Sequence, residues 1–346
     1  MKRRLLFSLL LPLLGFSAPA HAQSKELLLF NWTNYMPPAL LKRFEAETGI
    51  KVTLDTYDTN ESMLAKLQAG GTGYDVVVPS GPTVKAMIRD GLLLKSDVNA
   101  MPNFHNVRAP FDKPDFDPDR AYSAPYMWGT TGIAYDTAVA KGKLDDSWKE
   151  ILEPRPEFQG QIGMLSDMGE VFIAAAFYLG YDRCAEKPEE GQKILELLQR
   201  QKPYVKLYSA SGTVDRMASG EVAMQHAWNG SEHRAALKRP TLAYIYPREG
   251  TNLWADNFAI AKGARNIDNA KIFINFMMDP KNAAEASNFT GYNNTIAGSD
   301  QYLSDTLRND PAVNTPPAMM SRLSLSHECP KGSLDLRERI WTRLQR

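Results

Sequence analysis

Residues 27–38 read LLLFNWTNYMPP, an apolar run that gives way to polar and aromatic residues and then to two prolines. The run is typical of a strand buried on both faces, and the prolines fit the first turn of a helix over 39–48. The loop 31–35 is therefore expected at the carboxyl end of a buried strand, where open α/β sheets bind ligands. We predict that Trp32 and Tyr35 form one wall of a ligand site. The alternative is that both rings merely cover the strand end.

Strand and helix patterns alternate along most of the chain. The predicted strands cover 51–57, 74–80, 123–135, 162–165, 206–209, 222–228, 242–246 and 252–261. The predicted helices after the first cover 62–69, 83–90, 170–179, 191–200, 214–218 and 268–278. This alternation indicates βαβ units, and hence an α/β fold with a mostly parallel sheet.

The first 22 residues have the features of a secretory signal peptide: a basic start, an apolar run over 5–16 and small residues at 20 and 22. We expect cleavage after Ala22 and, because no later apolar run is long enough to span a bilayer, no membrane insertion. The leader holds three of the 40 Lys and Arg residues and none of the 40 Asp and Glu residues, which leaves a slightly acidic mature chain. That balance does not suggest nucleic acid as a partner.

Length and cysteine content set two further expectations. The mature chain exceeds the size at which a single core usually stops growing, which predicts two domains. Small residues within 123–135, notably Gly129 and Gly132, would allow that strand to cross between them. The two cysteines, Cys184 and Cys329, lack metal-site spacing, and an isolated pair in an oxidising compartment is expected to form a disulfide.

Carboxylates and aromatic residues follow several predicted strands. Asp167 and Glu170 come directly after the strand over 162–165, where they either bind a cation or form the N-cap and N3 positions of a capping box. Trp254 and Asp256 are two residues apart on extended chain, so their side chains share a face. A carboxylate beside an indole suits a cationic amine. A half-buried strand with a surface acid would give the same pattern.

The sequence carries no enzyme motif. There is no glycine-rich phosphate loop and no nucleophile elbow, and the mature chain's four histidines, at 105, 226, 233 and 327, lack metal-ligand spacing. We therefore expect a protein that is not an enzyme, with no catalytic residues, no metal and no cofactor.

Seven blocks resemble, in order, the bacterial periplasmic spermidine/putrescine-binding proteins that supply ABC transporters. They are NWTNYMPP (31–38), YDVVVPS (74–80), SAPYMWGTTGIAY (123–135), SDMGEVF (166–172), AWNGS (227–231), PREG (247–250) followed by WADNFAI (254–260), and FTGYNN (289–294). The resemblance implies a type II-like periplasmic binding protein. It would have two α/β lobes, each a mixed and mostly parallel sheet flanked by helices, joined by crossover strands and closing on a ligand between them. We expect 23–131 with 257–300 in lobe 1, and 132–256 with 301–346 in lobe 2.

The resemblance also implies roles for individual residues. The first loop would supply an aromatic pair, Asp167 with Glu170 would hold one ammonium group from the second lobe, and Asp256 would hold another. The ligand set that it implies is Trp32, Thr33, Asn34, Tyr35, Ser80, Asp167, Glu170, Trp228, Trp254, Asp256 and Tyr292.

Two positions depart from the family pattern. Asn34 stands where well-known members carry an acid, and Pro82 stands where a spermidine-type member has a tyrosine. Losing one carboxylate from a desolvated amine site costs roughly 1.5–3 kcal/mol. Our hypothesis is that the ligand is not spermidine in the usual pose. Putrescine, another short diamine, or an amine with a neutral or carboxylate far end would fit Asn34 better.

The sequence therefore predicts a monomeric periplasmic receptor that delivers a polyamine or related small amine to an inner-membrane ABC permease. One alternative is a ligand-sensing protein of the same fold that signals to a membrane sensor. Another is a binding protein for a non-polyamine amine such as an ω-amino acid.

Overall fold

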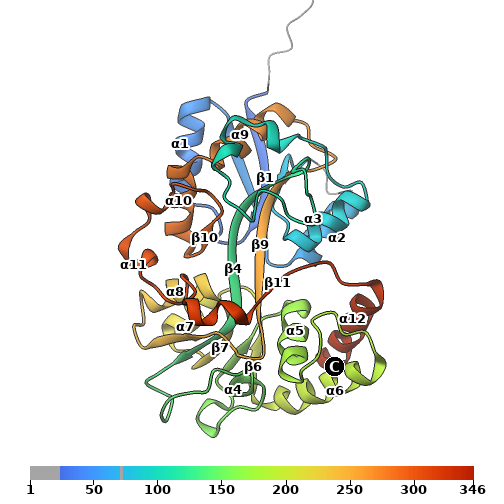
Figure 1. The fold of residues 1–346 in the computed structure, drawn as a ribbon, viewed down its shortest axis with the longest axis vertical. Coiled ribbons are helices and arrows are strands. Elements are labelled where there is room, and N and C mark those ends of the chain that lie inside the picture. Colours follow the sequence, from blue (N-terminus) through green and yellow to red (C-terminus); the bar gives the residue numbers. More distant parts are fainter. Residues whose placement is uncertain (1–23, 71–72) are drawn as a thin grey trace, which may run out of the picture.

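The computed structural model describes residues 24–70 and 73–346 (Figure 1). The expected signal peptide and its cleavage site lie outside the described residues. The strands are β1 (Glu26–Trp32), β2 (Lys51–Tyr57), β3 (Val76–Val77), β4 (Ser123–Asp136), β5 (Ile162–Met164), β6 (Val205–Tyr208), β7 (Met224–Trp228), β8 (Leu242–Ile245), β9 (Thr251–Ile260), β10 (Asn293–Asn294) and β11 (Leu323–Leu325).

The helices are α1 (Pro38–Thr48), α2 (Asn60–Gln68), α3 (Gly81–Arg89), α4 (Lys149–Leu152), α5 (Met168–Tyr178), α6 (Pro188–Gln201), α7 (Thr213–Ser219), α8 (Asn229–Ala236), α9 (Ile267–Met277), α10 (Pro280–Thr290), α11 (Asp305–Arg308) and α12 (Lys331–Gln345). Within the ranges that the structure describes, no helix is both long enough and apolar enough to cross a membrane.

The strands form one mixed sheet in the order β2-β1-β3-β9-β4-β7-β5-β6. Most parallel pairs lie in its two outer parts, where β1 pairs with β2 and β3, and β5 pairs with β6 and β7; the short β11 adds a further parallel pair beside β9. The long strands β4 and β9 are antiparallel to each other and run through both the upper and the lower half of the molecule (Figure 1). The predicted α/β class is confirmed, and the antiparallel centre of the sheet arises because β4 and β9 cross between the halves.

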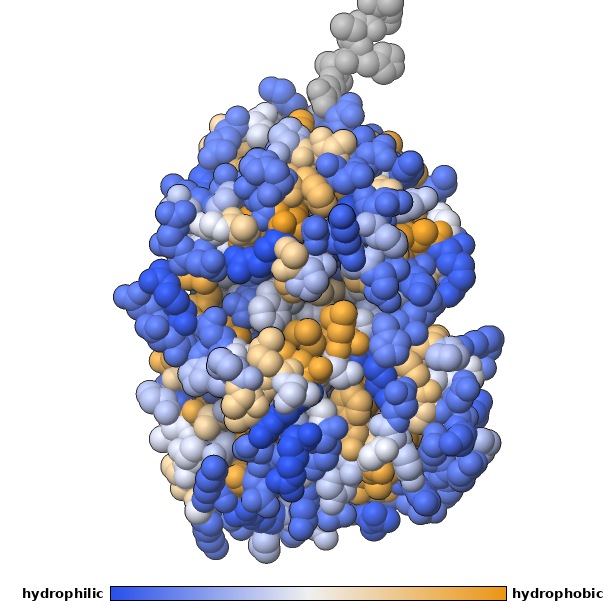
Figure 2. Space-filling model, viewed as in Figure 1, coloured by the Kyte–Doolittle hydropathy of each residue, from blue (hydrophilic) through white to orange (hydrophobic). Residues whose placement is uncertain are grey.

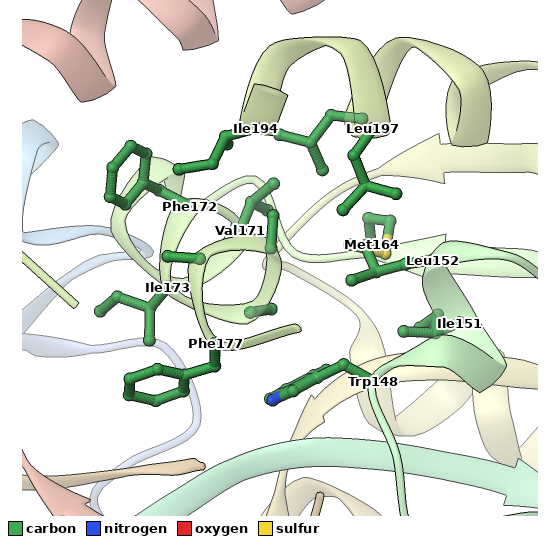
Figure 3. Close-up of a cluster of buried hydrophobic side chains, with 14 of the residues drawn as sticks. Trp148, Ile151, Leu152, Met164, Val171, Phe172, Ile173, Phe177, Ile194 and Leu197 are labelled. Carbon is green, nitrogen blue, oxygen red and sulfur yellow. The ribbon is translucent and has the colours of Figure 1, made fainter. Parts of the chain in front are cut away.

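Two sets of buried apolar side chains pack in different halves. The upper one brings Phe44 of α1 against Phe273 of α9 at a ring-centroid distance of 5.2 Å. The lower one surrounds α5, whose Phe172 lies near Ile194 of α6, with Trp148 on the opposite side of the helix (Figure 3). Full burial of one such aromatic side chain stabilises the fold by about 1.5–3 kcal/mol.

Strand β4 takes part in both cores. Met127 belongs to the upper set and Ile133 to the lower set, so the chain passes from one core to the other between these residues. This arrangement fits two lobes joined by crossover strands, while the lobe boundaries given above stay a prediction.

The helices α8, α10 and α12, of 8, 11 and 15 residues, were not predicted from the sequence. α12 buries Leu336, Ile340 and Leu344, which are spaced four residues apart on one helical face. This pattern was present in the sequence and identifies the helix. The predicted disulfide between Cys184 and Cys329 is confirmed, with Cα atoms 5.3 Å apart, and it links the chain before α6 to the residue just before α12.

Candidate functional site

A cavity of about 550 Å³ is lined by all eleven residues of the predicted ligand set. They come from the last residue of β1 and the loop after it (Trp32, Thr33, Asn34, Tyr35), the start of α3 (Ser80), the start of α5 (Asp167, Glu170), the end of β7 (Trp228), β9 (Trp254, Asp256) and the turn after α10 (Tyr292). The loop expected over 31–35 thus begins at Thr33, because β1 extends through Trp32. The notch at the right edge of Figure 2 lies where Figure 1 shows α3 above and α12 below, two helices that line this cavity. The structure thus brings the predicted residues together, and their ligand role stays a prediction.

The loop after β1 is fixed by side-chain bonds to the end of the neighbouring strand. The indole Nε1 of Trp32 donates to the Val78 carbonyl oxygen at 2.8 Å, and the Tyr57 hydroxyl donates to the same oxygen at 2.6 Å. Asn34 has φ +58°, in the left-handed region that asparagine tolerates better than most residues. Asparagine at this position can therefore be explained by the backbone conformation as well as by the ligand hypothesis. Aspartate would tolerate the same left-handed conformation.

Aromatic rings form a continuous part of the cavity wall. Tyr292 stands edge-on between Tyr35 and Trp254, at ring-centroid distances of 5.6 Å and 5.1 Å. Two glycines make room for these rings: a Cβ at Gly129 would lie 2.6 Å from the Trp254 indole, and one at Gly230 would lie 2.4 Å from the Tyr292 ring. The Trp254 Nε1 is buried and has no hydrogen-bond partner within the described chain, so it is a donor open to a ligand acceptor or a water.

Asp256 is the acid of this aromatic region. Its residue is 6% exposed, and its Oδ2 accepts a hydrogen bond from the Tyr35 hydroxyl at 2.9 Å. Burial raises the pKa of Asp256 to about 7, although the Tyr35 bond works in the opposite direction. No ion pair to Asp256 is present among the described residues. The cavity therefore holds a buried carboxylate that a cation would stabilise in its charged form.

Asp167 and Glu170 are placed by the first turn of α5. The Asp167 Oδ1 accepts from the Glu170 backbone N–H at 3.0 Å, so Asp167 is the N-cap, as one of the two predicted interpretations has it. The Glu170 carboxylate does not complete a capping box and instead accepts from the Asn252 side-chain amide at 2.9 Å. Both carboxylates also line the cavity, so the capping and ligand-binding interpretations are compatible.

A third carboxylate joins this pair from the opposite wall. Glu61, in the first turn of α2, lines the same cavity. Burial, and next the charge of Asp167, raise the pKa of Glu170 to about 7, and Glu61 faces the same Asp167 charge from a more exposed position. We refer to Glu61, Asp167 and Glu170 as the three-carboxylate group. Glu170 accepts from Asn252, whereas Asp256 stands four residues further along β9, about 13 Å of extended strand, and accepts from Tyr35. The cavity therefore holds two separate acidic regions.

Sequence reasoning missed Glu61 and two arginines, Arg183 and Arg337, which also line the cavity. Glu61 lies in the short connection between the strand predicted over 51–57 and the helix predicted over 62–69, so the strand-end rule that selected Asp167 would have found it. The arginines lie far away in sequence, and only the packing of α12 brings Arg337 to the site. Burial lowers the pKa of Arg337 to about 10, which leaves the guanidinium charged at neutral pH.

Polar contacts join the two sides of the cavity. The Ser211 hydroxyl, just before α7, donates to the Asp58 Oδ2 at 2.6 Å. Arg89 of α3 forms an ion pair with Glu328, which precedes α12. Both pairs link lining residues of the upper half to lining residues of the lower half, so they help to hold the described arrangement of the walls.

Comparison with known proteins identifies the family. The model of the family described as bacterial extracellular solute-binding protein matches residues 39–315. The chain is 36% identical over 302 residues to the spermidine/putrescine-binding periplasmic protein of Salmonella typhimurium, which covers 87% of this chain and 86% of that one. It is 32% identical over 340 residues to the putrescine-binding periplasmic protein SpuD of Pseudomonas aeruginosa, covering 94% and 93%.

A solved structure shows the same fold. It is that of a putative spermidine/putrescine ABC transporter protein from Listeria monocytogenes, with a TM-score of 0.88 and 31% identity, covering 93% of this chain and 99% of that one. The structural neighbours are two-lobed binding proteins, which confirms the predicted two-lobed fold class. The seven-block resemblance is confirmed as well, and the chain belongs to the bacterial extracellular solute-binding proteins.

Proposed function

We propose that this chain is a periplasmic receptor that binds a polyamine of the putrescine/spermidine class, preferably a short diamine, and delivers it to an inner-membrane ABC permease. The observation that carries the proposal is the presence of two separate acidic regions in one aromatic-lined cavity. A desolvated ammonium group needs a carboxylate partner, and a diamine has one ammonium group for each region.

The geometry gives each part of such a ligand a partner. Asp256, held by the Tyr35 hydroxyl, would pair with one ammonium group, and the three-carboxylate group would pair with the other. The methylene chain would lie against the aromatic wall, where apolar surface leaves water and the ring faces attract the adjacent cationic ends. Charge would set the ligand class and the spacing of the two regions would set its length.

Other features support the cellular role. The curated relatives are named as periplasmic binding proteins for spermidine and putrescine, and the basic, apolar and small-residue pattern of 1–22 supports export with cleavage after Ala22. We propose a monomer that acts by binding, without chemical turnover of the amine.

Calorimetric titration of the ligand-stripped mature protein tests the proposal. The panel is putrescine, cadaverine, agmatine, spermidine, spermine and γ-aminobutyrate. Tight binding of a diamine, with γ-aminobutyrate weak or silent, is the expected result. Silence with all the cationic amines would overturn the proposed ligand class, and a preference for γ-aminobutyrate would favour an ω-amino acid, whose carboxylate the nearby arginines would attract.

A further inference from the structure

Arg337 is a buried cation in the cavity wall that pairs with no carboxylate directly. It lies in the middle of α12 and is 9% exposed. Its Nη2 donates to the Arg183 carbonyl oxygen at 2.7 Å and to the Cys329 Sγ at 3.0 Å. Within the described residues no carboxylate oxygen lies within 4.0 Å of the guanidinium, and its Nε has no hydrogen-bond partner.

The guanidinium nevertheless lies next to the three-carboxylate group. A Cβ built on Gly169 would lie 3.6 Å from the Arg337 Nη1 and 3.2 Å from the Asp167 Oδ1, so both atoms border the same small space. The guanidinium carbon also stands 5.0 Å from the centre of the Phe172 ring, one turn along α5. The disulfide next to Arg337 and the first turn of α5 together hold the cation in this position.

The net charges of the two acidic regions therefore differ less than their numbers of carboxylates. The three-carboxylate group shares the cavity wall with Arg337 and Arg183. The Arg337 Nη1 borders the same space as the Asp167 Oδ1, and the Arg183 Nη2 donates at 2.9 Å to the Asn252 Oδ1, whose amide donates to Glu170. With every carboxyl ionised, as a bound cation favours, three negative and two positive groups leave one unit of negative charge. Asp256, which forms no ion pair within residues 24–70 and 73–346, also contributes one unit when it is ionised. Each region is thus balanced by one ammonium group.

We propose that Arg337 is a specificity-determining residue: it offsets part of the three-carboxylate group, so that the cavity accepts one ammonium group there and selects diamines over triamines. This inference rests on the proposed amine-binding function. A triamine would bring a second ammonium group toward the guanidinium, where like charges repel in a partly desolvated cavity. Asn34 and Pro82 act in the same direction from the opposite wall.

The test compares the dissociation constants of putrescine and spermidine in Arg337→Gln and in its matched control Arg339→Gln. Arg339 lies on the same helix, is exposed and does not line the cavity, so both variants change the net charge equally. We expect Arg337→Gln to reduce the preference for putrescine over spermidine by about tenfold, the scale of one weakened like-charge contact. Arg339→Gln should leave the preference unchanged.

A second variant keeps the test decisive if Arg337→Gln unfolds. Glu61→Gln, on an exposed residue, removes a negative charge from the same group and should shift the preference further toward putrescine. If the parent protein binds a diamine, two results would overturn the role of Arg337 while leaving the proposed function intact. One is an unchanged preference in Glu61→Gln and in any folded Arg337→Gln. The other is a shift in Arg339→Gln equal to that in Arg337→Gln. A parent protein that binds no cationic amine would overturn the proposed function, and this inference with it.

Discussion

The negative charges of the two acidic regions of the cavity are compensated in different ways. Asp256 is a single buried carboxylate whose oxygen is held by the Tyr35 hydroxyl, and it forms no ion pair within the part of the chain that the structure describes. The three-carboxylate group spreads its charge over two walls, and Arg183 and Arg337 line the cavity beside it. The first region depends strongly on its ligand because nothing else compensates it, whereas the second is partly compensated by the protein itself. Substitutions in the two regions should therefore differ in size.

The largest effect is expected at Asp256. Asp256→Asn should weaken putrescine binding at least about a hundredfold, because loss of one partner from a buried charge pair costs about 2–5 kcal/mol. Asp268→Asn, an exposed acid outside the cavity, is the matched control. Calorimetry on both variants is the measurement, and an unaltered dissociation constant in Asp256→Asn would exclude that residue from the site.

A smaller loss is expected at Glu170. Glu170→Gln should weaken putrescine binding by about tenfold, since two neighbouring carboxylates remain and the glutamine can still accept from Asn252. The exposed Glu196→Gln on α6 controls for the loss of a glutamate. If the effect at Glu170 equals or exceeds that at Asp256, the proposed difference between the two regions is wrong.

Acidification should affect binding and stability with opposite signs. Burial raises the pKa of both Asp256 and Glu170 to about 7 in the ligand-free protein, so below neutral pH a cationic ligand must displace protons. We expect putrescine affinity to fall between about pH 8 and pH 6 by about tenfold for each carboxyl that must lose its proton. Binding constants measured across this range, with buffers of different ionisation enthalpy, would report the released protons.

The stability of the ligand-free protein follows the same shifts in the other direction. Unfolded carboxyls titrate near pH 4, so between about pH 4 and pH 7 the folded state binds more protons through these groups. Their contribution to the free energy of unfolding therefore falls as the pH rises through that window. Asp256→Asn should reduce this pH dependence, as thermal unfolding can measure, and an identical profile in the variant would contradict the raised pKa.

The smallest effect is expected at Asn34. Asn34→Asp keeps the left-handed backbone and adds a carboxylate to the first loop, so spermidine should gain a few-fold in affinity relative to putrescine. The comparison of both ligands by calorimetry is the measurement. An unchanged ranking would assign the asparagine to the backbone conformation alone.

Local patterns in the sequence were enough to predict most elements around the site. The apolar run before Trp32, the extended segment around Trp254 and the cap at Asp167 all appear in the structure where periodicity and strand-end rules place them. Those rules work because ligand residues in α/β sheets follow strand ends, which can be recognised locally. The resemblance supplied what local rules could not, namely that these segments face one cavity.

The cations of the site were beyond such rules. The residues around Arg337 in the sequence are those of an ordinary helix. Its burial follows from the packing of α12 on the lower core and from the Cys184–Cys329 disulfide. Likewise, the residues next to Gly129 and Gly230 in the sequence do not show that the rings of Trp254 and Tyr292 occupy the space that a side chain at these glycines would fill. Contacts between residues so distant along the chain depend on the tertiary arrangement.

A crystal structure of the stripped protein with putrescine tests the central claim most directly. We predict that the diamine spans the cavity, with one nitrogen within hydrogen-bond distance of Asp256 and the other within that distance of Asp167, Glu170 or Glu61. A diamine that engages Asp256 alone, or that lies outside the cavity, would contradict the pairing of one ammonium group with each acidic region.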